Sequence, residues 1–276
     1  MPQSSSMRAV LLVCLTFCAT CAHASAVARA QALVREGKGQ EAVAVLRERL
    51  RARPDDIAAR RVLVRVLGIS GDVPQARAES AELAHWMPPD SPTAHIELGH
   101  ALELAHQYEE ALAEYDEAAS IAPASPDGPR EGGLRCAHWG LADAAGPRLE
   151  EAVRRGARDA ETWHALGLVR LHLGDVDGAE EAYRAGTASD PQRPENWLGL
   201  ATVAMVRGDA QSALVAYGQV LARRPYYAPA ELGRAWALAR LGRRDEALRA
   251  LNHAEQLGAP TANVARQRSG LSVPSP

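Results

Sequence analysis

Apolar residues recur at spacings of three and four along most of the chain, which is typical of helices that bury one face. One such set is Trp163, Leu166, Gly167, Val169 and Leu171. Gly174 and Asp175 follow it, where glycine can adopt a positive φ and aspartate can cap the next helix. Prolines at positions 54, 88, 123, 191 and 225 end the second apolar segments. The pattern predicts pairs of short amphipathic helices joined by tight turns.

Three segments of the chain align with one another, at residues 106–123, 174–191 and 208–225. Each has an alanine, an aromatic residue four positions later and a proline twelve positions after the alanine. The triplets are Ala111, Tyr115 and Pro123; Ala179, Tyr183 and Pro191; and Ala213, Tyr217 and Pro225. The last two segments are 34 residues apart, and the first precedes the second by twice that period. One helix pair cannot bury its own apolar face, so neighbouring repeats must stack.

Upstream of these segments stand Trp163-x-x-Leu166-Gly167 and Trp197-x-x-Leu200-Ala201, with Leu98-Gly99 in the earlier copy. These residues, with the 34-residue period, resemble the tetratricopeptide repeat. Counting at that period gives units at 23–56, 57–90, 92–125, 126–159, 160–193, 194–227 and 228–261. The resemblance implies an all-α fold, a right-handed α-α superhelical solenoid of about seven helix-turn-helix repeats that occupies residues 25–261.

Two parts of the chain depart from the repeat pattern. The fourth unit contains Pro126, Pro129, Gly132-Gly133 and Pro147, and is interpreted either as a tolerated irregular repeat or as a local bend. Residues 262–276 are expected to form a short polar capping helix over 262–268 and a Ser/Pro tail. Because this cap is thin, the C-terminal end is a candidate surface for self-association.

Residues 1–24 have the pattern of a secretory signal peptide. Arg8 gives the positive region, Ala9–Ala19 the apolar region, and Ala22-His23-Ala24 the cleavage pattern. Lipidation at Cys18 is disfavoured because the bulky Phe17 precedes it, and the apolar run is short for a membrane anchor. The predicted mature chain keeps one thiol, Cys136, which is expected to be a buried packing residue.

Composition argues against several functional classes. The net charge of −3 and the small number of aromatic residues make nucleic acid a poor candidate partner. Lys38 is the only lysine, and the chain carries no nucleotide, protease or hydrolase motif, so no catalytic residue and no cofactor is predicted. Histidines gather in the middle repeats, at His95, His100, His106, His138, His164 and His172. A metal or pH-responsive site there is the weaker interpretation, and a solvated polar groove is preferred.

In the tetratricopeptide family the first helix of each repeat lines a concave groove, and the resemblance places particular side chains there. The predicted partner-binding residues are Arg61, Arg65, His100, Arg130, Glu131, His164, Leu168, Met205 and Trp236. Leu198 and Leu232 are either part of this surface or packed between helices. The groove thus has a charged end and an apolar end, which suits a peptide or helix. It lacks the Lys- and Asn-rich clamp of chaperone-binding relatives and the Asn ladder of glycosyltransferase-type arrays.

Arginine outnumbers lysine by 30 to 1, which is typical of a GC-rich bacterial genome. Together with the signal peptide, this predicts a periplasmic or outer-envelope protein without a membrane span after cleavage. The preferred function is a non-enzymatic scaffold or adaptor that binds a peptide or protein segment. The alternative is a regulatory or substrate-presenting partner of an envelope enzyme, or of a polysaccharide or pilus export machine, that binds a glycan, lipid or other small ligand.

Overall fold

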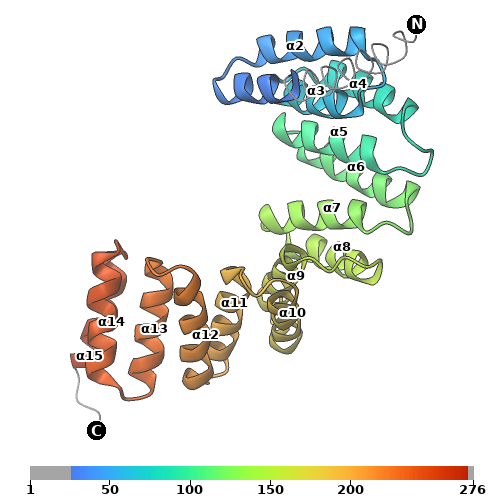
Figure 1. The fold of residues 1–276 in the computed structure, drawn as a ribbon. Coiled ribbons are helices and arrows are strands. Elements are labelled where there is room, and N and C mark those ends of the chain that lie inside the picture. Colours follow the sequence, from blue (N-terminus) through green and yellow to red (C-terminus); the bar gives the residue numbers. More distant parts are fainter. Residues whose placement is uncertain (1–25, 273–276) are drawn as a thin grey trace, which may run out of the picture. The chain divides into compact units, whose positions relative to one another are not determined.

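The computed structural model describes residues 26–272, and these form helices joined by short turns, with no strand among them (Figure 1). The predicted all-α fold is therefore confirmed for this part of the chain. The predicted signal peptide lies outside the described residues, as do the last four residues of the predicted tail.

The helices fall into two compact halves, one up to Gly132 and one from Gly133 onward. Residues 26–35 form the first helix. The N-terminal half continues with α2 (Gly39–Ala52), α3 (Ile57–Ile69), α4 (Val73–His85), α5 (Thr93–Leu104), α6 (Tyr108–Ile121) and the first part of α7 (Asp127–His138). The C-terminal half contains the rest of α7, α8 (Ala142–Arg154), α9 (Ala160–His172), α10 (Val176–Ser189), α11 (Pro194–Val206), α12 (Ala210–Arg223), α13 (Ala228–Arg240), α14 (Arg244–Gln256) and α15 (Thr261–Ser272).

We call the first helix of each repeat its A helix and the second its B helix, so α9, α11 and α13 are A helices. The turn between α9 and α10 shows how the pairs form. Gly174 has a φ of +85°, which a residue with a side chain rarely adopts. The Asp175 carboxylate then accepts a hydrogen bond of 2.9 Å from the backbone N–H of Gly178 and caps α10. The same Gly-Asp turn recurs before α4 and α12, as the sequence predicts.

Glycine in the A helices makes room for a tyrosine of the B helix. Tyr183 of α10 is 2% exposed and lies between Gly167 of α9 and Gly199 of α11. A Cβ atom would stand 2.7 Å from the Tyr183 ring at Gly167 and 2.3 Å at Gly199. These distances are far below van der Waals contact, so the helices can approach this closely only because both residues are glycine. Burial also raises the pKa of Tyr183 to about 12.

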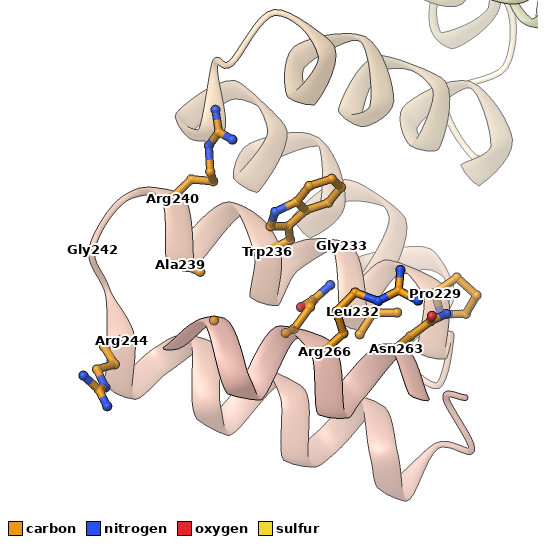
Figure 2. Close-up of a pocket in the computed structure, with 12 residues that line it drawn as sticks. Pro229, Leu232, Gly233, Trp236, Ala239, Arg240, Gly242, Arg244, Asn263 and Arg266 are labelled. Atoms are coloured by element: carbon orange, nitrogen blue, oxygen red, sulfur yellow. The ribbon is translucent and has the colours of Figure 1, made fainter. Parts of the chain in front are cut away.

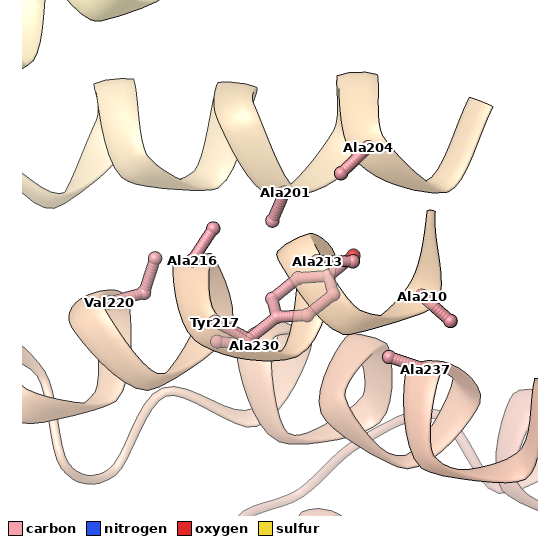
Figure 3. Close-up of a cluster of buried hydrophobic side chains, with 9 residues drawn as sticks. All are labelled: Ala201, Ala204, Ala210, Ala213, Ala216, Tyr217, Val220, Ala230 and Ala237. Carbon is pink, nitrogen blue, oxygen red and sulfur yellow. The ribbon is translucent and has the colours of Figure 1, made fainter. Parts of the chain in front are cut away.

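Alanine dominates the core of the C-terminal half (Figure 3). The best example surrounds Tyr217 and is built by Ala201, Ala204, Ala210, Ala213, Ala216, Val220, Ala230 and Ala237. In Figure 3 the alanines of α11 and α13 face α12 from either side. Short side chains let three helices pack closely around one large ring, which explains why alanine and tyrosine recur at a fixed spacing in the sequence.

The irregular fourth repeat still forms two helices. Pro129 is in the first turn of α7, where no intrahelical N–H bond is lost, whereas Pro147 lies inside α8. Cys136 of α7 is buried, as expected of a packing residue. The division between the two halves also falls in this repeat, between Gly132 and Gly133.

The C-terminal helix is longer than predicted. In place of a helix over 262–268, α15 runs from Thr261 to Ser272 and contacts α13 and α14. Val264 anchors it, because this side chain is 1% exposed and belongs to the core cluster that contains Leu238 and Leu251. Its position places a further helix beside the last A helix of the array.

Candidate partner-binding site

In the N-terminal half, two predicted binding residues share one buried carboxylate. Glu97 of α5 has a fully buried side chain, and the Arg61 guanidinium on α3 donates to it at 2.7 Å. Arg65, one turn further along α3, donates to both of its carboxylate oxygens, at 2.9 Å in the Nη2–Oε1 bond. A buried carboxylate needs such partners to offset its lost hydration. Both arginines remain almost half exposed, and the three groups together keep one positive charge.

Three more predicted residues gather next to one another in the same half. The Glu131 carboxylate lies 3.1 Å from Nε2 of His100, and Nη1 of Arg130 donates to its other oxygen at 2.6 Å. The His100 ring also stands edge-on to Tyr115, with ring centroids 5.7 Å apart. His100, Arg130 and Glu131 therefore form a hydrogen-bonded group that links α5 to α7, and their role in binding stays a prediction.

In the C-terminal half, His164 is half-buried, with its ring centroid 6.0 Å from that of Tyr183. Burial, and secondarily the charge of Arg193, lowers the pKa of His164 below its usual value. Leu168 and Trp236 are different, because these large apolar side chains are 49% and 51% exposed. The side chains of Leu168 and Trp236 are therefore available to a partner, whereas the imidazole of His164 is packed against Tyr183.

Other apolar residues assigned to the groove are mostly used for packing. Met205 and Leu198 are partly buried against the cluster around Tyr217. Leu232 is partly buried against the cluster that contains Leu251. The sequence left open whether Leu198 and Leu232 pack between helices or face the groove, and both side chains do pack against the core.

A hollow of about 740 Å³ lies between α13, the turn after it and α15 (Figure 2). This size is in the usual range of ligand pockets. Its lining residues are Pro229, Leu232, Gly233, Trp236, Ala239, Arg240, Gly242, Arg244, Asn263, Arg266, Gln267 and Gly270. Trp236 on α13 and Arg266 on α15 lie on its two sides in Figure 2, and Arg240 and Arg244 stand at its edge near the Gly242 turn. We call this hollow the terminal pocket.

Most residues that line the terminal pocket are not among the predicted binding residues. The 34-residue period could nevertheless have identified several of them. Four lining residues of α13 are Pro229, Leu232, Gly233 and Trp236, and adding 34 to each number gives Asn263, Arg266, Gln267 and Gly270. These are the lining residues of α15. This helix therefore continues the A-helix register, and extending the period past residue 261 would have found them.

The same register identifies the matching face on earlier A helices of this half. The residues that correspond to Leu232, Trp236 and Arg240 are Leu198, Thr202 and Val206 on α11, and His164, Leu168 and His172 on α9. We call this the groove face. Its exposed apolar residues include Leu168, Val206, which is 60% exposed, and Trp236.

The described residues contain no group of three or more histidine, cysteine or acidic side chains placed to hold a metal ion. Of the histidines that gather in the middle repeats, His95 lies 2.7 Å from Glu114 and His100 lies 3.1 Å from Glu131, each beside a single carboxylate. Within residues 26–272 no helix is long and apolar enough to span a bilayer.

Models of the tetratricopeptide repeat match the sequence at residues 24–66, 92–125, 160–203 and 204–266, which together make up more than half of the chain. No curated protein matches the sequence significantly.

Solved structures of similar fold include several repeat proteins. YrrB, described as a tetratricopeptide protein with an unusual peptide-binding site, is 19% identical, with a TM-score of 0.60 over 65% of this chain and 93% of its own. PilF of Pseudomonas aeruginosa is 18% identical, with a TM-score of 0.60 over 78% and 99%. PilW, described as a type IV pilus biogenesis factor, is 18% identical, with a TM-score of 0.54 over 74% and 94%. With the matched repeats and the stacked helix pairs, these likenesses in fold show that the chain belongs to the tetratricopeptide repeat family.

Proposed function

We propose that this protein is a non-enzymatic scaffold of the bacterial cell envelope that binds an extended segment of a partner protein along its groove face. The observation that carries the proposal is the exposure of large apolar side chains on that face. Leu168, Val206 and Trp236 are each about half or more exposed, and the 34-residue period places all three on the same face of three successive A helices. Exposed apolar residues on the same face of successive helices are typical of a binding surface.

The envelope part of the proposal rests on the sequence of residues 1–24 and on the neighbours in fold. A signal peptide would export the chain, and the described residues add no membrane-spanning helix. PilW, a type IV pilus biogenesis factor, shares the fold, and so does YrrB, a protein with a peptide-binding site. These likenesses favour a role in assembling an envelope machine.

The alternative is a partner of an envelope enzyme or export machine that binds a glycan, lipid or other small ligand. The terminal pocket supports it, because a hollow of about 740 Å³ is large enough for such a ligand. The scaffold is favoured because the exposed apolar residues extend beyond that pocket to α9 and α11, which suits an extended segment better than a compact molecule.

Affinity capture from envelope extracts tests the proposal, with two matched valines. Val206 on the groove face is 60% exposed, and Val215 on the B helix α12 is 58% exposed. Val206→Ser is expected to weaken partner binding about ten-fold, since burying a valine against a partner is worth about 1.5 kcal/mol. Val215→Ser should leave binding unchanged. Equal binding by both variants, or a loss only in Val215→Ser, would refute the groove face as the binding surface.

The signal peptide is tested separately. Expression of the full chain in a Gram-negative host, followed by fractionation and N-terminal sequencing, should find periplasmic protein that begins at Ser25. Uncleaved protein in the cytoplasm would remove the envelope part of the proposal and leave the scaffold part intact.

A further inference from the structure

The terminal pocket has the charge of a site for an anionic partner. Arg240, Arg244 and Arg266 line it, and its lining includes no acidic residue. The three guanidinium groups form no ion pair among the described residues, whereas most other arginines of this half are paired with carboxylates. Arg266 beside the hollow and Arg240 and Arg244 at its edge produce a positive field that attracts negative groups.

Glu231, a buried carboxylate on α13, has other partners than the arginines of the terminal pocket. Glu231 precedes Leu232 on α13, and its side chain is only 4% exposed. It lies 2.9 Å from Nδ1 of His253 and 2.8 Å from the guanidinium of Arg234, on the side of α13 that packs against α14. Glu231 is thus already partnered by Arg234 and His253, whereas the three arginines of the terminal pocket are exposed to solvent.

The same pocket also offers an apolar surface. Trp236 is 51% exposed, and Leu232, Pro229 and Ala239 lie beside it along the same helix. Tryptophan and arginine are the residue types that contribute most at protein interfaces, because the indole buries a large area and guanidinium binds carboxylates in a fixed geometry. Asn263 and Gln267 on α15 add amide groups that can bind a peptide backbone.

We infer that the terminal pocket binds an acidic protein segment that carries one large apolar side chain. The apolar side chain packs on Trp236 and Leu232, and neighbouring aspartate or glutamate side chains pair with Arg266 and with the two arginines at the edge. This inference rests on the proposed function and specifies the chemistry of the partner at one end of the groove face. It also assigns α15 a role in recognition beyond covering the end of the array.

Gly270 permits a test that removes no existing contact. A Cβ atom added at Gly270 meets nothing within 4 Å, and the residue lines the pocket. Gly270→Glu therefore adds a carboxylate to the lining of the terminal pocket, where it competes with an acidic ligand. Gly218→Glu is the matched control, because Gly218 lies in the helix α12, is exposed and also has no atom within 4 Å of an added Cβ.

The arginines are tested by replacing Arg240, Arg244 and Arg266 together with glutamine. The matched control replaces Arg29, Arg35 and Arg51, which are exposed, far along the chain in the N-terminal half and equal in charge. Because one exposed ion pair contributes about two- to five-fold in affinity, the triple pocket variant should bind about ten-fold or more weakly. The control triple variant should bind like the original protein.

The probe is a library of random twelve-residue peptides displayed on phage, selected on the original protein at low salt. Selection should enrich peptides with several acidic residues around a Trp, Phe or Leu. Synthetic copies should bind less tightly to Gly270→Glu and to the pocket triple variant, and binding should weaken as salt screens the charges. Inorganic phosphate and vesicles of anionic lipid are run as competitors and should not displace the peptides at millimolar concentration.

Three outcomes would overturn the inference. The first is enrichment of neutral or basic peptides, and the second is acidic peptides that bind equally well to the pocket variants and the controls. In both cases peptide binding survives, so the proposed scaffold function stands while the terminal pocket is excluded. The third is that selection on the original protein enriches no peptide beyond what the pocket triple variant enriches, while phosphate or anionic vesicles bind the original protein. The ligand of the terminal pocket would then be an anion other than a protein segment.

Discussion

Replacing Gly199 by alanine tests the packing that sets the distance between repeats. An ideal Cβ at this position stands 2.3, 2.4 and 2.5 Å from three atoms of the Tyr183 ring. Favourable carbon contacts lie at about 3.5–4.0 Å, so the ring or the helix must move by about 1 Å or more. Tyr183 is 2% exposed and is confined on its other side by Gly167, so the ring cannot move into solvent.

The expected cost follows from two opposing effects. Overpacking of a filled core costs about 1–3 kcal/mol, while alanine is favoured over glycine inside a helix by about 1 kcal/mol. Gly199→Ala should therefore lower the free energy of unfolding by about 1 kcal/mol. Gly218→Ala, where an added Cβ meets no atom within 4 Å, should raise it by up to about 1 kcal/mol. The two substitutions are chemically identical and are expected to have opposite signs.

Urea unfolding followed by far-ultraviolet circular dichroism measures both changes. Combining Gly199→Ala with Tyr183→Leu isolates the contact, because a smaller side chain at position 183 should abolish most of the cost of the alanine. If Gly199→Ala stabilises the protein as much as Gly218→Ala does, or if the cost is unchanged beside Leu at position 183, the packing argument is wrong.

Three further predictions concern polar groups. Glu97→Gln should lower the free energy of unfolding by about 1–2 kcal/mol in urea titrations, because the buried partner of two half-exposed arginines loses its charge; unchanged stability would show that the arginines are held otherwise. Asp56→Ala should cost about 2 kcal/mol in the same assay, because Asp56 caps α3 through the N–H of Ala59 at 3.0 Å and also accepts from Arg49 at 2.7 Å; a loss no larger than that of an exposed Asp→Ala change would contradict it. Burial lowers the pKa of His164 below 6.5, so on acidification the unfolded chain binds a proton at this residue before the folded chain does. The stability of the folded state that depends on neutral His164 is therefore complete above pH 6.5 and is lost as the pH falls. His164→Gln should therefore flatten the dependence of Tm on pH below about 6.5, and an unchanged slope would exclude His164 as its source.

The repeat architecture could be predicted from the sequence because the same residue types pack in the same way in each repeat. Alanine and tyrosine recur at a fixed spacing since one tyrosine ring fills the gap between helices that touch through alanine and glycine. The turn chemistry was equally local, and Gly174 with Asp175 forms the expected turn and cap. The length of α15 was not predicted, because its polar sequence has no strong apolar period and its position depends mainly on the burial of Val264.

The candidate site was predicted only in part. The sequence named His100, Arg130, Glu131, Leu168 and Trp236 as binding residues, and the structure shows the first three hydrogen-bonded together and the last two about half exposed. Helical register states which face a residue occupies, but it does not state how far a long side chain reaches or what it meets. The structure was therefore required to show that Glu97 pairs with both arginines of α3, and that Trp236 and three arginines line one hollow.

The sequence by itself determined the helix pairs, their turns and their stacking, because these depend on contacts within a repeat and with the next repeat along the chain. The tertiary structure decided which charged side chains neutralise one another and which remain free. That outcome depends on distances of a few ångströms between residues more than thirty positions apart, as between Arg61 and Glu97. The tertiary structure also turned a polar C-terminal segment into one wall of the terminal pocket, since only the docking of α15 against α13 and α14 creates that hollow.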